Sequence, residues 1–156
     1  MLIKPGYDKN KHQIYKPLNI DKYKGRSYPI CRSTWEYSFC RWLDGNEKVL
    51  QWESEPLPIP YKDPTNQIIN GRIKTRRYFP DFLVKVMSGG EIKTWLIEIK
   101  PYKETIPPKR SGRQSTKTVL YEAKTWAVNQ AKWKAAEIYC NRRDWVFKIL
   151  TEKSLF

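Results

Sequence analysis

The chain of 156 residues contains a single histidine, His12. This shortage excludes histidine-dependent nucleases, zinc hydrolases and zinc fingers with histidine ligands. Cysteine is also scarce: Cys31, Cys40 and Cys140 are an odd number and show no CxxC spacing. Such cysteines predict free thiols in a reducing cytoplasm. The sequence has no GxxxxGK[ST] segment, so the chain carries no P-loop of a nucleotide-driven motor.

Long apolar runs are missing as well. No window approaches 18 apolar residues, 29% of the residues are charged and the mean hydropathy is −0.74, which together exclude a membrane-spanning helix. The first residues lack the apolar core of a signal peptide, which agrees with a cytoplasmic protein. A hydrophobic content of 40% with seven tryptophans is enough for a core, and the length predicts one domain.

Acidic residues are few relative to basic ones. Sixteen Asp and Glu stand against thirty Lys and Arg, which gives a net charge of +14 and a pI near 9.7. An excess of this size favours a polyanionic partner, because cationic side chains release counterions from nucleic acid. The alternatives are a merely soluble basic protein and one that binds RNA inside a ribosome. We expect contact with nucleic acid.

A hairpin is the most informative local pattern. Two runs rich in β-branched and aromatic residues, 78–87 and 92–100, flank Gly89-Gly90, a strong signal for a two-residue loop. Such a loop pairs residue 88 with residue 91, and continuing this register sets Asp81 opposite Glu98, with Cβ atoms roughly 5 Å apart. Lys100 lies two residues beyond Glu98 and returns to the same face of its strand.

Two facing carboxylates repel each other unless a cation lies between them. Asp81 and Glu98, with the backbone carbonyl of Ile99, offer the oxygen ligands that Mg²⁺ prefers, and Mn²⁺ is expected to substitute. Lys100 can orient a metal-bound water or stabilise charge at a phosphate. The alternative is an exposed strand ion pair, but the apolar residues around Glu98 indicate a strand buried on both sides.

The remaining pattern predicts an α-β-β-β-α-β order, which is typical of a mixed sheet flanked by helices. A helix is predicted over residues 33–44, whose apolar stripe contains Trp35, Phe39, Trp42 and Leu43. A strand follows at 49–55, extended by a proline-rich run over 56–61, and a polar connection covers 62–76 before the hairpin of 77–100. Residues 118–143 predict a long helix and 145–150 a strand beside the hairpin. Residues 1–31 show no period and predict an extended basic arm, ordered on the surface or on a partner, which leaves 32–156 as the folded domain.

The predicted long helix has an apolar stripe formed by Leu120, Ala123, Ala127, Ala131, Ala135 and Ile138. Trp126 and Trp133 are either base-stacking residues or core residues, of which core is the more common. The loop between the hairpin and this helix is basic and is either a binding loop or a solvated one. The candidates for DNA contact are Arg32, Lys109, Arg110, Arg113, Lys117, Lys124, Gln130 and Lys134.

The order Pro80-Asp81 … Glu98-x-Lys100 on consecutive strands resembles the PD-(D/E)xK nuclease superfamily. Four stretches together look like the head completion nucleases of T-even-type tailed phages, a branch related to the TnsA-type endonuclease subunit of certain transposases. They are 32–44, 77–82, 96–101, and 129–134 with 145–151. The resemblance implies a restriction-endonuclease-like fold. It also implies a DNA endonuclease that acts on the DNA end at the time when packaging into the head is completed.

The resemblance also implies partners and a third acid. It implies double-stranded DNA as the substrate and no contact with a membrane. The implied protein partners are portal, neck or other head completion proteins, and the implied location is the host cytoplasm or the virion head or neck.

Nucleases of this type often contribute an acid from the first helix, which would be Glu36, although Ser33-x-x-Glu36 is also a capping box. Glu53 and Glu55 are weaker candidates for this acid. A non-catalytic plug that binds DNA and portal, and a TnsA-type transposase subunit, remain as alternatives.

Overall fold

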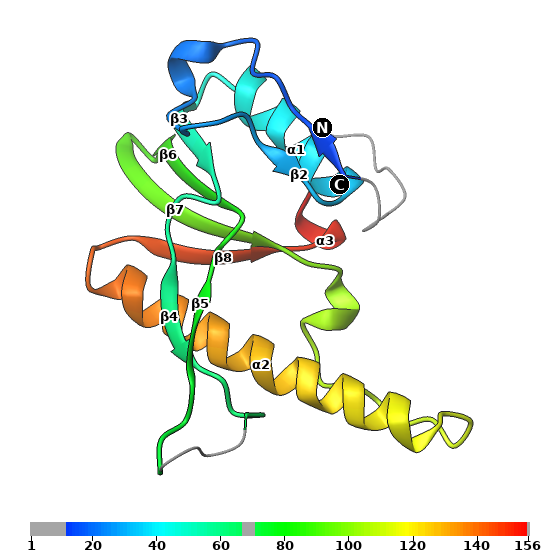
Figure 1. Cartoon of the computed structure of the whole chain (residues 1–156). Helices are drawn as coiled ribbons and strands as arrows, with labels where there is room; N and C mark the ends of the chain where they lie inside the picture. Colours follow the sequence, from blue (N-terminus) through cyan, green and yellow to red (C-terminus); the bar gives the residue numbers. More distant parts are fainter. Residues whose placement is uncertain (1–11, 67–70, 156) are drawn as a thin grey trace.

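The structure is a computed structural model of the whole chain, and it describes residues 12–66 and 71–155 (Figure 1). Its centre is a four-stranded sheet with the order β3 (Val49–Ser54), β6 (Phe82–Ser88), β7 (Glu91–Ile99) and β8 (Val146–Leu150). The β3–β6 and β6–β7 pairs are antiparallel, whereas β7 and β8 are parallel. The predicted mixed sheet is confirmed.

The β6–β7 hairpin has the predicted register. Ser88 pairs with Glu91 at the turn, and Phe82 pairs with Ile97 at the other end. Gly89 and Gly90 have φ of 60° and 80°, which glycine adopts without the steric cost of a Cβ, so the two-residue turn forms. Asp81 lies one residue before β6 and Glu98 one residue beyond the paired Ile97.

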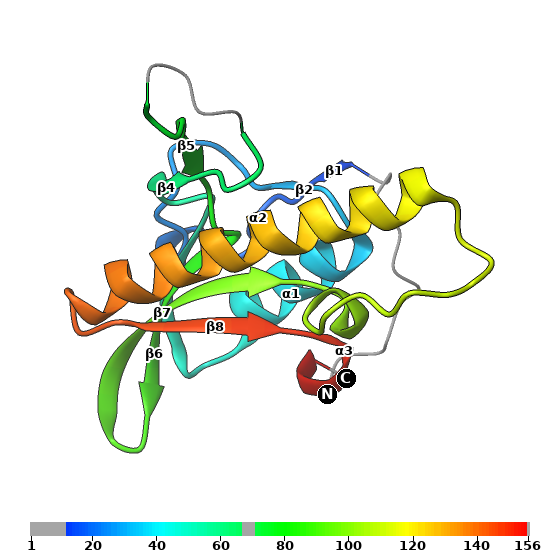
Figure 2. The same ribbon diagram turned by 90° about the horizontal axis from the view of Figure 1, so that it is seen from below.

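Helices cover both faces of the sheet. In Figure 1, α1 (Thr34–Gly45) lies above the sheet and α2 (Thr116–Asn141) below it. Figure 2, seen from below, shows α2 crossing in front of the sheet. Side chains alternate along a strand, so Ile97 and Ile99 of β7 pack in the core on the α1 side, whereas Leu96 packs with Trp133 on the α2 side. The prediction that this strand is buried on both sides is confirmed, since residues 96–99 are all buried.

Helix α1 matches its prediction closely, because cap and stripe both specify it. Ser33 caps it by accepting a hydrogen bond from the Glu36 N–H at 3.1 Å. Trp35, Phe39 and Leu43 are buried against the sheet. Near the end of the helix, the buried Asp44 accepts hydrogen bonds from the Tyr15 hydroxyl at 2.7 Å and from the Leu18 N–H at 2.7 Å. This carboxylate ties the preceding segment to the domain.

The segment before α1 is more closely packed than an arm ordered only on the surface. It contains β1 (Gln13–Ile14), η1 (Ile20–Lys22) and β2 (Ile30–Cys31), and it buries Tyr15 and Tyr23 in the α1-side core. The sequence lacks a period here because the aromatic anchors are spaced irregularly. Residues 1–11 lie outside the described residues, so the division of the chain at residue 31 stays a prediction.

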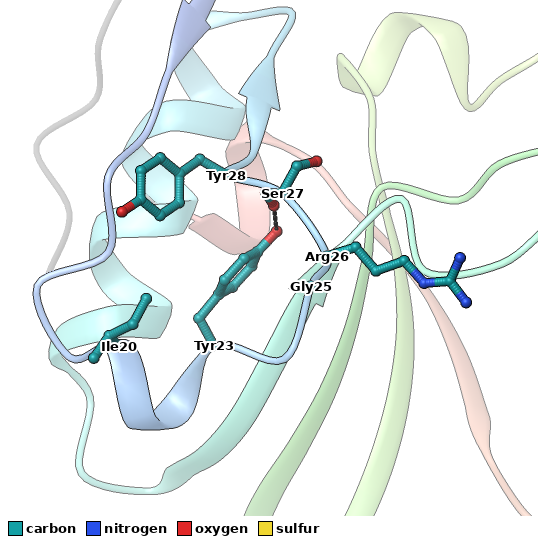
Figure 3. Close-up of a pocket in the computed structure, with 6 residues that line it drawn as sticks. All are labelled: Ile20, Tyr23, Gly25, Arg26, Ser27 and Tyr28. Carbon is teal, nitrogen blue, oxygen red and sulfur yellow. Dashed lines mark hydrogen bonds between the residues drawn. The ribbon is translucent and has the colours of Figure 1, made fainter.

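A tight loop between Tyr23 and Tyr28 shows how this segment is fixed (Figure 3). The Tyr23 hydroxyl donates to the Ser27 carbonyl at 2.6 Å, which closes the loop. The Tyr23 ring passes so close to Gly25 that a Cβ on this glycine would lie 2.2 Å from the Tyr23 hydroxyl oxygen. Glycine is therefore required at position 25 for the ring to take this position.

A second, two-stranded sheet was not predicted. The proline-rich run that was expected to extend β3 instead forms β4 (Ile59–Lys62), which pairs antiparallel with β5 (Thr75–Tyr78). The expected hairpin of 77–100 is therefore interrupted, because the chain leaves one sheet at Tyr78 and joins the other at Phe82. Pro80 lies at this crossing, where it donates no ladder hydrogen bond. Of the expected connection over 62–76, residues 67–70 lie outside the described residues.

The apolar stripe predicted for α2 is wrong in its outer positions. Leu120 and Ile138 are exposed, and the residues buried against the sheet are Asn129, Trp133, Ala136 and Cys140. The N-terminal half of α2 runs past the edge of the sheet (Figure 1), so no neighbouring element selects an apolar face there. The short elements η2 (Tyr102–Glu104) and α3 (Glu152–Leu155) complete the described chain, in which no helix has the length and apolar character to cross a membrane.

Candidate active site

Asp81, Glu98 and Lys100 meet where β6 begins and β7 ends. The Asp81 Oδ2 atom accepts a hydrogen bond from the Ile99 N–H at 2.7 Å, which holds the carboxylate against β7. The Lys100 Nζ lies 3.5 Å from Glu98 Oε1. The hairpin therefore brings together the two acids and the lysine, because its register sets residue 81 beside residue 98.

The neighbouring carboxylates perturb the pKa of Asp81. The pKa of Asp81 is raised well above its usual value by burial, and then by the charges of Glu98 and Glu36, while the Ile99 N–H and Lys100 oppose the rise. Burial also raises the pKa of Glu98, with Lys100 as the strongest opposing influence. One lysine thus faces a cluster of three acids. An arrangement of this kind binds a cation favourably, because the cation offsets repulsion that the fold already contains.

Tyr78 is part of the site although the sequence reasoning gave it no role. Its hydroxyl donates to Glu98 Oε2 at 2.6 Å. Burial, followed by the charge of Glu98, raises the pKa of Tyr78, so the hydroxyl stays protonated and remains a donor at neutral pH. Tyr78 ends β5, three residues before Asp81. The sequence does not reveal its contact with Glu98, because the chain passes from one sheet to the other between Tyr78 and Phe82 and the pattern of residues does not show this change.

Lys132 of α2 is the second group that the sequence reasoning missed. Its Nζ lies 5.8 Å from the centre of the Tyr61 ring and 5.7 Å from that of Tyr78. Burial lowers its pKa, and the charge of Glu98 opposes that shift. A second ammonium group therefore faces Glu98 from the helix. Lys132 lies off the predicted apolar stripe, so only the observed rotation of α2 reveals it.

Glu36 occupies a helix cap close to these acids. Its Oε2 accepts from the Arg32 N–H at 2.9 Å, and its Oε1 accepts from the Ser33 hydroxyl at 3.2 Å. In the usual capping box the returning carboxylate binds the N–H of the cap residue itself, whereas here it binds the N–H of the residue before. Burial raises the pKa of Glu36, and its charge in turn raises the pKa of Asp81. A cap role and a role beside the metal are thus both compatible with its position.

The two weaker candidates for the third acid differ in their surroundings. Glu53 is half-buried on β3, and burial raises its pKa. Glu55 is exposed, forms an ion pair with Arg32 at 3.1 Å, and donates its N–H to the Asp81 carbonyl at 2.8 Å. The Arg32 guanidinium, a candidate for DNA contact, is thus held by Glu55 beside the site.

The donor set fits a hard divalent cation, although the described residues contain no group of three His, Cys, Asp or Glu side chains arranged to hold one. The ligands available are carboxylate oxygens, which Mg²⁺ prefers. Asp81 accepts the hydrogen bond from the Ile99 N–H through Oδ2, while both Glu36 oxygens accept hydrogen bonds in the cap. Coordination by Glu36 would require its side chain to leave the cap. The Ile99 N–H binds Asp81, and a role for the Ile99 carbonyl stays a prediction.

The basic candidates of the connecting loop and of α2 are exposed. These are Lys109, Arg110, Arg113, Lys117, Lys124 and Lys134. Gln130 lines a hollow of about 650 Å³, together with Thr105, Trp126 and Phe147. Trp133 is 7% exposed and belongs to the α2-side core, so the core interpretation of this tryptophan is confirmed.

A mixed sheet between α1 and α2, with two acids and a lysine at the end of a central hairpin, defines a restriction-endonuclease-like fold. Residues 46–152 match the family described as the TnsA-like endonuclease N terminal, and the chain belongs to this family. The chain is also similar to the head completion nuclease of Enterobacteria phage T4, with 43% identity over an alignment of 143 residues that covers 89% of each protein. Both findings support a nuclease.

Proposed function

We propose that the protein is a Mg²⁺-dependent DNA endonuclease that hydrolyses phosphodiester bonds, acting on DNA ends when packaging into a phage head is completed. The observation that carries the proposal is the convergence of Asp81, Glu98 and Lys100. The charge of Glu98 raises the pKa of Asp81, and a bound cation would offset this repulsion between the two carboxylates. The name of the phage T4 relative supports the setting in head completion.

Each group has a distinct task in this proposal. Asp81 and Glu98 would hold the metal, with the Ile99 carbonyl as a further ligand and Glu36 as another once its side chain leaves the cap. A bound Mg²⁺ would supply charge neutralisation at the phosphate and a lowered pKa for a bound water, and Mn²⁺ would substitute for it. Lys100 orients the attacking water or stabilises charge at the scissile phosphate. The Tyr78 hydroxyl and the Ile99 N–H fix the two carboxylates, so that less reorganisation is needed when the cation binds.

Double-stranded DNA is the proposed substrate, and the net charge of +14 supports this class of partner. The loop 103–117 and the projecting half of α2 extend from the site, and their exposed cations are suited to phosphate contacts on one side of the cut. Arg32, which directly precedes the cap of α1, is suited to a phosphate contact near that helix. Portal, neck or other head completion proteins are the proposed protein partners, met in the host cytoplasm or in the virion head or neck.

The test is a cleavage assay with purified protein on two substrates, linear duplex DNA and the same DNA as a closed circle. We expect cleavage with Mg²⁺ or Mn²⁺ and none in excess chelator. Faster cleavage of the linear form would support action at ends. Binding of DNA without cleavage in any divalent metal would overturn the enzyme assignment and favour the non-catalytic plug. The exposed Asp21, changed to Asn, is a control that removes one carboxylate from η1 and should leave cleavage unchanged.

A further inference from the structure

The two-stranded sheet of β4 and β5 is strongly basic. We call residues 59–62 and 71–78 the basic ribbon; it contains no acid, and its exposed cations are Lys62, Arg72, Lys74, Arg76 and Arg77. The adjacent Asp63 forms an ion pair with Arg76 at 3.0 Å. Within the described residues the other four cations have no carboxylate partner. An array of like charges this dense is costly unless an anion covers it.

One face of the basic ribbon is committed to the core. Ile59, Tyr61 and Tyr78 are buried in the cluster that contains Trp133 of α2. The register pairs Pro60 with Arg77 and Lys62 with Thr75, so these four residues share the opposite, outer face. The outer face therefore carries exposed, charged side chains, while the inner face packs on α2. Pro60, Lys62 and Thr75 also line an open hollow with Lys134 of α2.

The basic ribbon leads directly into the candidate active site. Its last residue, Tyr78, donates to Glu98, and Asp81 follows three residues later. An extended chain spans at most about 3.3–3.6 Å per residue, so Arg77 lies within about 15 Å of Asp81 and Lys74 within about 25 Å. At about 3.4 Å per base pair, these cations reach phosphates within about seven base pairs of the cut.

We propose that the outer face of the basic ribbon is a duplex-DNA-binding surface that holds the phosphate backbone on one side of the scissile bond. The inference rests on the proposed function for the position of the cut. It commits to duplex DNA, because single-strand binders rely on aromatic rings that stack on bases. The paired outer-face residues Pro60, Lys62, Thr75 and Arg77 include no aromatic ring. The exposed ring of Phe79, just beyond them, lies under the Arg77 guanidinium, which is 5.7 Å from the ring centre. Phosphate contacts, rather than base contacts, are what such a surface supplies.

The test measures binding of a labelled linear duplex in chelator, so that no cleavage takes place, over a range of salt concentration. The variant Lys62→Ala/Arg77→Ala removes two charges from the outer face. The matched control, Lys85→Ala/Lys93→Ala, removes two exposed charges from β6 and β7 of the main sheet. Melting temperatures confirm that both variants are folded.

We expect the salt slope of the ribbon variant to be flatter by about two units, since each phosphate contact contributes about 0.9. Between 50 and 200 mM salt, the affinity advantage of the wild type should then shrink about tenfold. The control should keep the wild-type slope, and a single strand of the same length should show no difference between ribbon variant and wild type. A ribbon variant with the wild-type slope, a control that loses the same slope, or an equal loss on single strands would each overturn the proposal.

A cleavage arm separates this proposal from the proposed function. With Mg²⁺, the ribbon variant should show a raised KM and an unchanged kcat, because the ribbon binds DNA without touching the reacting atoms. If the wild type shows the ribbon-dependent slope but cuts no DNA, the nuclease assignment fails and the binding surface stands. If the wild type cuts DNA and the ribbon variant keeps both slope and KM, the binding surface fails and the nuclease assignment stands.

Discussion

Replacing Asp81 by Asn should stabilise the metal-free protein. The change removes one of three mutually repelling carboxylates and leaves an amide oxygen that can still accept the hydrogen bond from the Ile99 N–H. Two charges about 5 Å apart repel by about 3 kcal/mol at an effective dielectric constant of about 20. Lys100 offsets part of this repulsion. We therefore expect a gain of about 1–3 kcal/mol at neutral pH, or about 2–10 °C in melting temperature for a protein of this size.

The sign of the pH dependence follows from the raised pKa of Asp81. Between the unfolded pKa, about 4, and the higher folded pKa, the folded state binds more protons than the unfolded state. Stability in chelator should therefore fall as pH rises through this window, and the contribution of Asp81 to the fall should be complete above the folded pKa. The raised pKa values of Glu36 and Glu98 act in the same direction and remain in the variant, so its profile should be flatter without being flat.

The assay is thermal and urea unfolding of both proteins in chelator from about pH 5 to about pH 8, repeated with Mg²⁺. Mg²⁺ should stabilise the wild type and have little effect on Asp81→Asn, because the cation binds the folded acid cluster. Asp63→Asn is the control of opposite sign: hydrogen bonds from Thr65, followed by Arg76, lower the pKa of Asp63, so its neutralisation should cost stability at neutral pH. The reasoning is refuted if Asp81→Asn is no more stable than wild type near pH 8, or if Mg²⁺ stabilises both equally.

Three further changes test individual groups. Glu36→Gln should keep folding stability within about 0.5 kcal/mol, because the amide oxygen can still accept the hydrogen bond from the Arg32 N–H, yet reduce turnover sharply in a Mg²⁺ titration; a wild-type rate would leave Glu36 as a cap alone. Lys132→Met should raise the pKa of Glu98 by removing a nearby cation, so the acidic limb of the cleavage profile should move to higher pH, and an unmoved limb would remove Lys132 from the site. In the connecting loop, a triple Ala variant should flatten the salt slope of DNA binding by about two to three units, and an unchanged slope would exclude this loop from the DNA path; the residues are Lys109, Arg110 and Arg113.

The hairpin and α1 were predictable because local chemistry specifies them. A Gly-Gly turn with both φ values positive fixes the loop length, and the loop length fixes the register that sets Asp81 beside Glu98. In α1, Ser33 and the apolar stripe independently indicate the same boundaries and the same buried face. Sequence alone was sufficient for the geometry on which the candidate site depends.

The groups around that geometry depend on contacts distant in sequence. The prolines of 56–60 concealed β4, whose pairing with β5 carries Tyr78 to Glu98. The apolar period of α2 was wrong at its two ends, Leu120 and Ile138, and it gave no sign that Lys132 lies near Glu98, since that contact depends on the packing of α2 on the sheet. The scattered tyrosines of residues 12–31 show no period, yet Tyr15 and Tyr23 are core residues.

The most direct test of the central claim is the single-turnover cleavage rate of Asp81→Asn and Lys100→Ala on linear duplex DNA across a Mg²⁺ titration, with DNA affinity measured on the same samples. If Asp81, Glu98 and Lys100 form the catalytic site, both variants should lose cleavage by about a thousandfold or more while binding DNA with nearly wild-type affinity. Cleavage by Asp81→Asn at the wild-type rate, or cleavage by the wild type that persists in excess chelator, would contradict the account.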